Sequence, residues 1–277
     1  MSNGKKRGNI LTIDFESWTY GDHPLLKDLT SEKRKQLDNN YLYDSTYRLL
    51  DILDDYNTKA TFFIVAEGFD WYPECIKEIK DRGHEIGYHS HDHQNVLFRE
   101  ILLAQLNKSN KFLKKYKPAG FRAPEMKFDP QNIDLLKNHG FTYTSSIYSS
   151  VLKIEYKNGF LEFPVSVANI FGREAIISEG LLLKNMVTNI PIGSGFFFGL
   201  MRDRIRFFFN KPRHIFIHNW QVIKPENAFF PDLKFLLKHP FYWPYTVNLY
   251  KPFIQLLEKV KFEPISKYFE LNHDNQG

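Results

Sequence analysis

Short apolar stretches that alternate with helix-like patterns constrain the fold of this chain most strongly. Residues 59–65 form a continuous apolar run, as expected for a strand of a parallel sheet that is covered on both faces. Further strands are predicted at 9–14, 85–88, 120–122, 141–143 and 214–218, and helices at 45–56, 73–81, 100–116, 129–139 and 253–261. This alternation predicts an α/β protein with a parallel sheet and helical crossovers, either open or closed into a barrel.

Composition narrows the class of protein further. The 277 residues suit one large α/β domain or two small ones. The net charge of +5 is modest for this length and does not indicate nucleic-acid binding. The single cysteine, Cys75, excludes an intramolecular disulfide framework. No apolar run is long enough to span a membrane and no signal peptide is evident, so the expected location is cytoplasmic. The oligomeric state is not indicated.

Polar residues gather where the predicted strands end. In parallel α/β folds the functional site lies at the carboxyl ends of the strands. Six residues with chemically useful side chains lie at or just beyond such ends, namely Asp14, Glu16, His89, His93, Arg122 and His218. We therefore expect these residues to form one site.

The histidines are the first candidates for metal ligands. His89 and His93 are four residues apart, so one helical turn would direct both imidazoles to one point and would direct His91 away. The pair alone is a weak signal, because histidine-rich loops are often solvated. A third ligand is available from Asp14 or Glu16, which alternate with Phe15 and therefore lie on one side of an extended strand end. Two histidines, one carboxylate ligand and a second carboxylate as base would make a catalytic metal site.

Five ordered motifs give the chain a family resemblance. Over roughly residues 9–225 it resembles the polysaccharide deacetylases of the NodB-homology group, also called carbohydrate esterase family 4. The motifs are Thr12-Ile13-Asp14-Phe15-Glu16, Ala60-Thr61-Phe62-Phe63, His89-Ser90-His91-Asp92-His93, Phe121-Arg122-Ala123-Pro124 and Ile217-His218. Further runs resemble members found with surface-polysaccharide biosynthesis, including Glu162-Phe163-Pro164-Val165-Ser166 and His218-Asn219-Trp220-Gln221.

The resemblance implies a fold and an activity. The expected fold is a deformed (β/α) barrel with about seven parallel strands. Residues 1–277 would form one catalytic domain, with a core at about 9–225 and a C-terminal extension at about 226–277. The expected function is that of a metal-dependent hydrolase that removes N-acetyl groups from an N-acetylhexosamine in a polysaccharide, a glycan or a lipid-linked precursor.

The resemblance also implies a role for each site residue. The family has adjacent aspartates in its first motif, whereas Phe15 separates Asp14 from Glu16 here. Asp14 then matches the general base and Glu16 the third metal ligand beside His89 and His93. The reverse assignment stays open, and so does a site that binds metal through the two histidines and water. Arg122 would orient Asp14, and His218 would protonate the leaving amine. Two histidines and a carboxylate suit zinc, and also cobalt, nickel, iron or manganese.

Pro124, Glu125 and Trp220 are the expected substrate-binding residues. Pro124 fixes a turn after Arg122, and a backbone N–H near Glu125 would face the oxyanion. Glu125 departs from the tyrosine that the family has at this position. Two alternatives remain, namely a metal-independent C–N hydrolase of the allantoinase or cyclic-imidase type on the same fold, and an inactive carbohydrate-binding relative.

Residues 193–209 contain a second pattern. The glycine- and phenylalanine-rich run 193–199 could stack on sugar rings, and the arginines at 202, 204 and 206 precede three phenylalanines. Such a basic, apolar edge suits peripheral contact with a membrane surface or a lipid-linked glycan. We favour the alternative, a buried amphipathic helix with its arginines facing outward.

Overall fold

The computed structural model describes residues 8–20, 26–156, 159–169, 189–190, 209, 211–226, 233–238 and 246–268. The glycine-rich run 193–199 and the arginines at 202, 204 and 206 lie outside these residues, so the predictions for them stay untested. Within the described part of the chain, no helix is long and apolar enough to cross a membrane.

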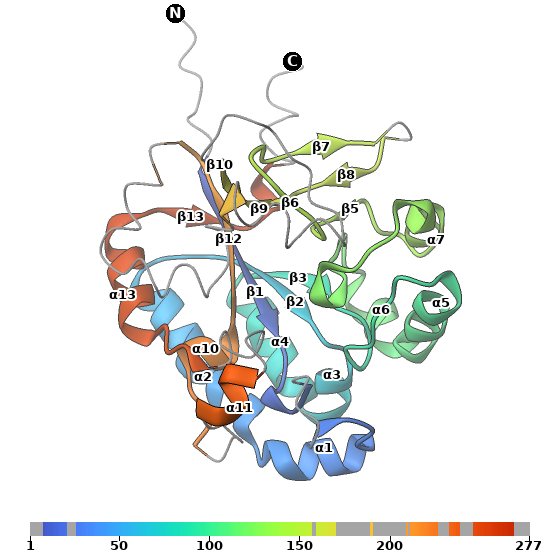
Figure 1. Cartoon of the computed structure of the whole chain (residues 1–277), viewed down its shortest axis with the longest axis horizontal. Coiled ribbons are helices and arrows are strands. Elements are labelled where there is room, and N and C mark those ends of the chain that lie inside the picture. Colours follow the sequence, from blue (N-terminus) through green and yellow to red (C-terminus); the bar gives the residue numbers. More distant parts are fainter. Residues whose placement is uncertain are drawn as a thin grey trace, which may run out of the picture.

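A curled, mainly parallel sheet forms the centre of the molecule (Figure 1). Its strand order is β12-β1-β2-β3-β4-β5-β8-β7, with β13 beside β1, and every pairing except β7 with β8 is parallel. The strands are β1 (Asn9–Phe15), β2 (Thr61–Ile64), β3 (Glu85–Tyr88), β4 (Gly120–Phe121), β5 (Tyr143–Thr144), β7 (Ile154–Glu155), β8 (Leu161–Glu162), β12 (His214–His218) and β13 (Phe262–Glu263). Seven parallel strands from β12 to β8 confirm the predicted number and the barrel-like class.

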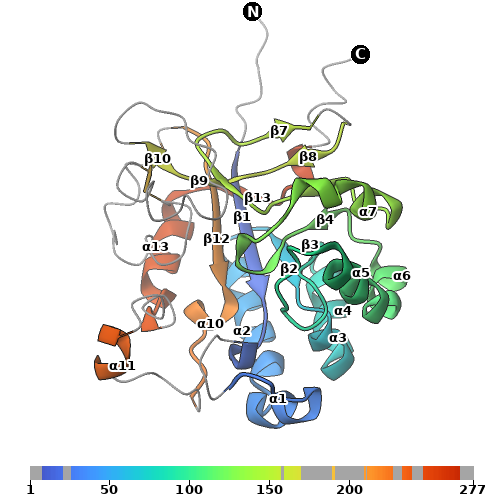
Figure 2. The same ribbon diagram turned by 45° about the vertical axis from the view of Figure 1, so that its right-hand side comes forward.

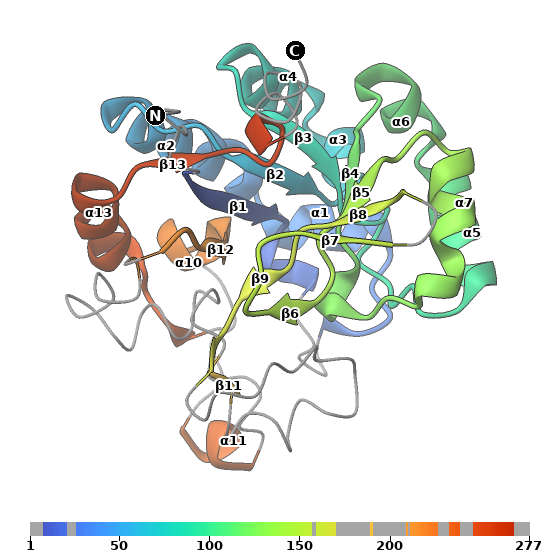
Figure 3. The same cartoon turned by 90° about the horizontal axis from the view of Figure 1, so that it is seen from above.

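Helices cover the outside of the curled sheet, as the view from above shows (Figure 3). The helices are α1 (Ser31–Asp38), α2 (Tyr41–Asp55), α3 (Glu67–Trp71), α4 (Pro73–Asp81), α5 (Arg99–Lys108), α6 (Asn110–Tyr116), α7 (Ile133–Asn138), α10 (Asn219–Val222), α11 (Leu233–Lys238) and α13 (Tyr250–Lys259). Short 3-10 turns are η1 (Trp18–Tyr20), η3 (Pro124–Met126) and η4 (Pro130–Asn132). Two small sheets pair β6 (Tyr148–Ser149) with β9 (Val165–Ser166) and β10 (Ala168–Asn169) with β11 (Asn189–Ile190).

Among the described residues, no strand ladder joins β8 to β12 and closes the sheet. Between β8 and β12 the chain of β9 approaches β12 instead, and side chains bridge the two segments. The His214 backbone N–H donates to Ser166 Oγ at 2.8 Å, and His214 Nδ1 lies 3.0 Å from the Pro164 carbonyl. The barrel is therefore deformed between β8 and β12, where contacts of His214 at the start of β12 replace strand pairing.

The helix predicted at 100–116 is two helices, α5 and α6, which meet at Ser109. The Ser109 hydroxyl lies 2.9 Å from the Tyr88 hydroxyl and 3.2 Å from His91 Nδ1. Ser109 is buried and makes these contacts across to the end of β3, which a sequence pattern of helical period does not reveal. The helical break thus supports the histidine-rich segment that follows β3.

The C-terminal segment joins the same sheet. β13 pairs with β1 in parallel, and the backbone N–H of Ile265 donates to Thr61 Oγ1 at 2.8 Å. Ile265 is fully buried with Ile10 and Phe63 in a shared apolar cluster. Residues beyond the expected core boundary at 225 therefore contribute to the central core.

Candidate active site

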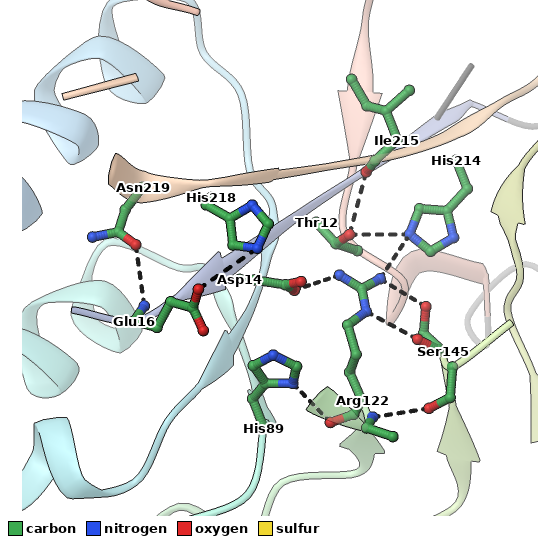
Figure 4. Close-up of polar contacts among 12 residues, drawn as sticks. Thr12, Asp14, Glu16, His89, Arg122, Ser145, His214, Ile215, His218 and Asn219 are labelled. Carbon is green, nitrogen blue, oxygen red and sulfur yellow. Dashed lines mark hydrogen bonds and ion pairs between the residues drawn. The ribbon is translucent and has the colours of Figure 1, made fainter. Parts of the chain in front are cut away.

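The carboxyl ends of β1 and β12 bring three of the expected residues together (Figures 2 and 4). β1 pairs with β12 so that Asp14 lies opposite His218, and Glu16 follows immediately after β1. The Glu16 backbone N–H donates to Asn219 Oδ1 at 3.1 Å, which ties the end of β1 to the start of α10. Asp14 and Glu16 are both almost fully buried. The alternation Asp14-Phe15-Glu16 therefore brings both acids to one region, as predicted.

The histidine segment after β3 is not a helical turn. Ser90 and His93 have left-handed backbone angles, with φ of 64° and 59°, which cost energy for residues other than glycine. Backbone hydrogen bonds hold this conformation, since Ala66 N–H donates to the Ser90 carbonyl and Glu67 N–H to the His91 carbonyl. The predicted convergence of His89 and His93 is correct, but a strained loop produces it.

Glu16, His89 and His93 form a cluster that can hold a metal ion. One nitrogen of each histidine and one Glu16 oxygen lie within 4.8 Å of one another. His89 Nδ1 lies 2.8 Å from the Arg122 carbonyl, which can only accept, so Nδ1 carries the proton and Nε2 keeps its lone pair for a ligand bond. The structure thus groups Glu16, rather than Asp14, with the histidines.

One oxygen of Glu16 supports this interpretation. Oε2 is buried and accepts no hydrogen bond, although His93 Nε2 lies 3.0 Å away. A carboxylate oxygen buried this deeply needs a cation or a donor beside it, and a divalent ion bound between Glu16 and a neutral His93 would satisfy the ligand atoms of both residues. Oxygen and imidazole donors in this set fit a divalent ion such as zinc.

Electrostatics favour a charged Glu16 and a neutral His89. Burial raises the pKa of Glu16, but the nearby His93, His218 and His89 outweigh burial and hold that pKa well below its usual range. Burial lowers the pKa of His89 to about 4. An ionised carboxylate and a neutral imidazole are the forms that bind metals.

Asp14 lies in a different environment, against Arg122 (Figure 4). Arg122 is fully buried, and its Nη1 lies 2.5 Å from Asp14 Oδ1. The guanidinium contacts Asp14 through Nη1 and not through a bidentate pair of N–H groups. Two other donors contact Ser145, with Nε to the carbonyl at 2.9 Å and Nη2 to Oγ at 2.7 Å. The Phe63 ring packs against the guanidinium, 4.2 Å from its carbon Cζ.

His214 is a member of this network that the sequence analysis missed. It is fully buried, and its Nε2 lies 3.3 Å from Arg122 Nη2 and 3.1 Å from Thr12 Oγ1. Because Nδ1 faces the Pro164 carbonyl, Nε2 must be the acceptor. Burial and the charge of Arg122 hold the pKa of His214 well below its usual range. The period of two along β12, which places 214 and 218 on one face, could have revealed it.

His218 and Trp220 complete the site on the β12 side. His218 Nε2 lies 3.6 Å from Glu16 Oε1, and its Nδ1 lies 3.4 Å from Gln221 Oε1. Its ring is stacked on Trp220, with 4.4 Å between centroids. Trp220 is only 4% exposed, and its Nε1–H donates to Glu16 Oε1 at 3.1 Å.

Pro124 and Glu125 lie in η3, directly after Arg122 and Ala123. Pro124 is buried at the start of this turn. Glu125 adopts a left-handed conformation, with φ of 56°, and its carboxylate pairs with Lys127 Nζ at 2.6 Å. The turn expected at Pro124 is therefore present, while the Glu125 side chain is engaged with its own loop.

A pocket of about 920 Å³ opens beside the metal-ligand cluster at His93. Its wall includes Tyr20, whose hydroxyl donates to Glu67 Oε2 at 2.6 Å. Arg34 donates to the same carboxylate, with Nε to Oε2 at 2.9 Å and Nη2 to Oε1 at 3.1 Å. This pocket has room for a small-molecule or sugar-sized group next to the site.

Parts of this chain are similar in sequence to known proteins. Residues 22–144 match the family model described as polysaccharide deacetylase. The peptidoglycan deacetylase of Helicobacter pylori is 32% identical over 105 residues, which cover 36% of each chain. The peptidoglycan-N-acetylglucosamine deacetylase of Bacillus cereus is 41% identical over 51 residues, 18% of each chain. These alignments span well under half of the relatives' length.

Solved structures share the fold over nearly the whole chain. A Mycobacterium smegmatis protein assigned to the polysaccharide deacetylases aligns with a TM-score of 0.63 at 18% identity, covering 100% of this chain and 93% of that one. An allantoinase aligns with a TM-score of 0.57 at 16% identity, covering 99% and 92%. The sequence similarity to polysaccharide deacetylases is thus confined to part of the chain, around residues 22–144, while the fold is shared with these solved structures over nearly the whole chain.

Proposed function

We propose that this chain is a divalent-metal-dependent hydrolase that removes the acetyl group from an N-acetylhexosamine in a polysaccharide, a glycan or a lipid-linked precursor. We also treat residues 1–277 as one catalytic domain, since β13 extends the sheet that carries the site. The observation that carries the proposal is the cluster of Glu16, His89 and His93, whose ligand atoms lie within 4.8 Å of one another, beside the Asp14–Arg122 pair.

Glu16, His89 and His93 would hold the metal ion. A divalent ion bound there would polarise the acetyl carbonyl and lower the pKa of water toward neutrality. Zinc suits this donor set best, and cobalt, nickel, iron and manganese also accept it. The His89 contact with the Arg122 carbonyl would keep the ring oriented for this task.

Asp14 would act as the general base. One of its oxygens is fixed by Arg122 at 2.5 Å, so the carboxylate cannot rotate away from the site. Arg122 itself is fixed by Ser145 and His214. A base held in this way can take a proton from a water molecule that attacks the acetyl carbon.

His218 would act as the general acid. Its Nδ1 faces Gln221 Oε1, and its Nε2 faces the Glu16 side of the site. The departing sugar amine must gain a proton, because otherwise the tetrahedral intermediate collapses back to the amide. Pro124 and Glu125 would bound the acetyl group, with a backbone N–H of their turn facing the oxyanion.

Acetate release tests this function. The full chain is incubated with N-acetylglucosamine oligomers after treatment with a chelator, and again after addition of zinc or cobalt. We expect acetate release only with added metal, and none from the His89→Ala/His93→Ala variant. The exposed His139 on the flank of α7 provides a matched control, so His139→Ala should behave as wild type.

Two results would overturn the proposal. Acetate release that survives both chelation and the double substitution would exclude metal-dependent catalysis. Metal binding without release of acetate from any N-acetylated glycan would instead indicate an inactive carbohydrate-binding protein.

A further inference from the structure

We propose that Trp220 is a positioning residue for the metal ligand Glu16 and for His218, rather than a wall that contacts the sugar. This inference rests on the proposed function, because it assigns Glu16 as a ligand. It replaces the sequence-based assignment of Trp220 to substrate binding. The structural ground is that one buried indole contacts both side chains.

The first contact restrains the Glu16 carboxylate. Trp220 Nε1–H donates to Glu16 Oε1 at 3.1 Å, while Oε2 faces His93 Nε2 at 3.0 Å. An indole N–H can only donate and does not titrate near neutral pH. It therefore occupies Oε1 throughout the working pH range and leaves Oε2 as the oxygen available for the metal.

The second contact restrains the Glu16 backbone from the same helix. Asn219 precedes Trp220 in α10 and accepts the Glu16 backbone N–H at 3.1 Å. Asn219 is fully buried. Two consecutive residues of α10 thus hold Glu16 at its main chain and at its side chain, which fixes the direction of the carboxylate.

The third contact supports His218. The two rings are stacked with 4.4 Å between centroids and 25° between planes. This stacking and the Gln221 contact at Nδ1 leave His218 Nε2 directed toward Glu16 Oε1, at 3.6 Å. The position of the proposed acid and the position of the ligand therefore depend on the same indole.

Burial argues against a direct sugar contact. Trp220 is 4% exposed and packs with Trp18 and Tyr41 in a small apolar cluster. Aromatic residues that stack on sugars need an accessible face. Outer hydrogen bonds to metal ligands commonly change metal affinity by about 10- to 100-fold, so loss of the Nε1–H should be measurable as weaker metal binding.

The experiment separates the indole N–H from the ring. Trp220→Phe keeps an aromatic ring beside His218 but removes the donor to Glu16. We expect its zinc dissociation constant, measured by competition with a chromophoric chelator, to rise about 10- to 100-fold. We also expect an altered visible absorption spectrum of the cobalt form. At saturating metal, kcat should recover to within about tenfold of wild type, whereas Trp220→Leu should stay lower because His218 loses its support.

Two controls keep the result interpretable. Trp71→Phe removes a comparable indole hydrogen bond, to Ser31 Oγ at 3.1 Å, and should leave zinc affinity unchanged. If Trp220→Phe does not fold, benzothienylalanine at position 220 keeps the shape and replaces only the N–H with sulfur.

The outcomes distinguish this inference from the proposed function. If wild type binds no metal, the proposed function fails. If wild type binds zinc and Trp220→Phe binds it within twofold, with a raised KM for the glycan, this inference alone fails and Trp220 is a substrate contact.

Discussion

Asp14 and Glu16 are two residues apart at the end of one strand, yet their surroundings are opposite. Both side chains are buried, at 3% and 4% exposed. Asp14 is bound by Arg122, whose other donors are taken by Ser145 and His214. Glu16 is held at Oε1 by Trp220, but its Oε2 accepts no hydrogen bond.

The difference teaches how one motif can supply two chemical roles. Protein groups hold Asp14 through Arg122, and Ser145 and His214 hold Arg122 in turn, so the position of the Asp14 carboxylate does not depend on a ligand. In the Glu16 cluster, a carboxylate oxygen and the nitrogens of two histidines lie close together, so a bound cation would stabilise the cluster. We expect that loss of any partner in the Asp14 network lowers the stability of the protein. We expect that the Glu16 cluster responds mainly to the presence or absence of bound metal.

The largest predicted effect breaks the Asp14 network. Arg122→Met removes a fully buried cation and leaves Asp14 without its charge partner. Breaking a buried ion pair in this way costs about 3–5 kcal/mol, and chemical denaturation should show this loss. His93→Gln, in the Glu16 region, should lose much less stability because Glu16 keeps its bond to Trp220. Equal losses in the two variants would contradict the comparison.

A smaller effect is expected at His214, which supports Arg122 from behind. His214→Leu removes the acceptor for Arg122 Nη2 and the partner of the Pro164 carbonyl. Loss of buried hydrogen-bond partners should cost about 1–3 kcal/mol, and kcat should fall more than KM changes. His214→Gln retains an acceptor and should recover part of both. Wild-type kcat in His214→Leu would show that Arg122 needs no such support.

A separate effect, a pH dependence of stability, is expected at Glu162, which supports the loop that carries Ser145. Glu162 Oε1 accepts the Ser146 backbone N–H at 2.8 Å, and burial raises the pKa of this carboxyl to about 8. The folded state then binds one proton more than the unfolded state between pH values of about 4.5 and 8. The Glu162 contribution to stability is therefore present at low pH and falls as pH rises through this window.

Glu162→Gln keeps the acceptor and removes the titration. We subtract the unfolding free energy of the variant from that of wild type. This difference should decrease as pH rises from about 4.5 to 8, by at most about 1.4 kcal/mol per pH unit. Denaturant titrations at several pH values measure this slope. A difference that stays constant between pH 5 and 8 would show that Glu162 has an ordinary pKa.

Periodicity and strand ends predicted much of the fold and of the candidate site. Mainly apolar runs identified β1, β2 and β12, since strands buried on both faces are rich in apolar residues along their whole length. The carboxyl-end rule for parallel sheets then brought together Asp14 and His218, which are paired in register.

Features set by contacts across the sheet could not be predicted in the same way. The left-handed angles at Ser90 and His93 depend on hydrogen bonds from the start of α3, and no local propensity encodes them. The period of two along β12 places His214 on the same face as His218, but the role of His214 follows only from its contacts with Thr12 and Arg122. The bond between Trp220 and Glu16 joins residues 204 positions apart, and no local pattern indicates it.

Metal affinity and turnover of Asp14→Asn and Glu16→Gln, measured side by side, test the central claim most directly. The account predicts that Asp14→Asn binds zinc as wild type does, while its kcat falls about 10²- to 10⁴-fold through loss of the base. It predicts that Glu16→Gln binds zinc more weakly than wild type does. Loss of zinc in Asp14→Asn with retention in Glu16→Gln would reverse the two roles and contradict the account.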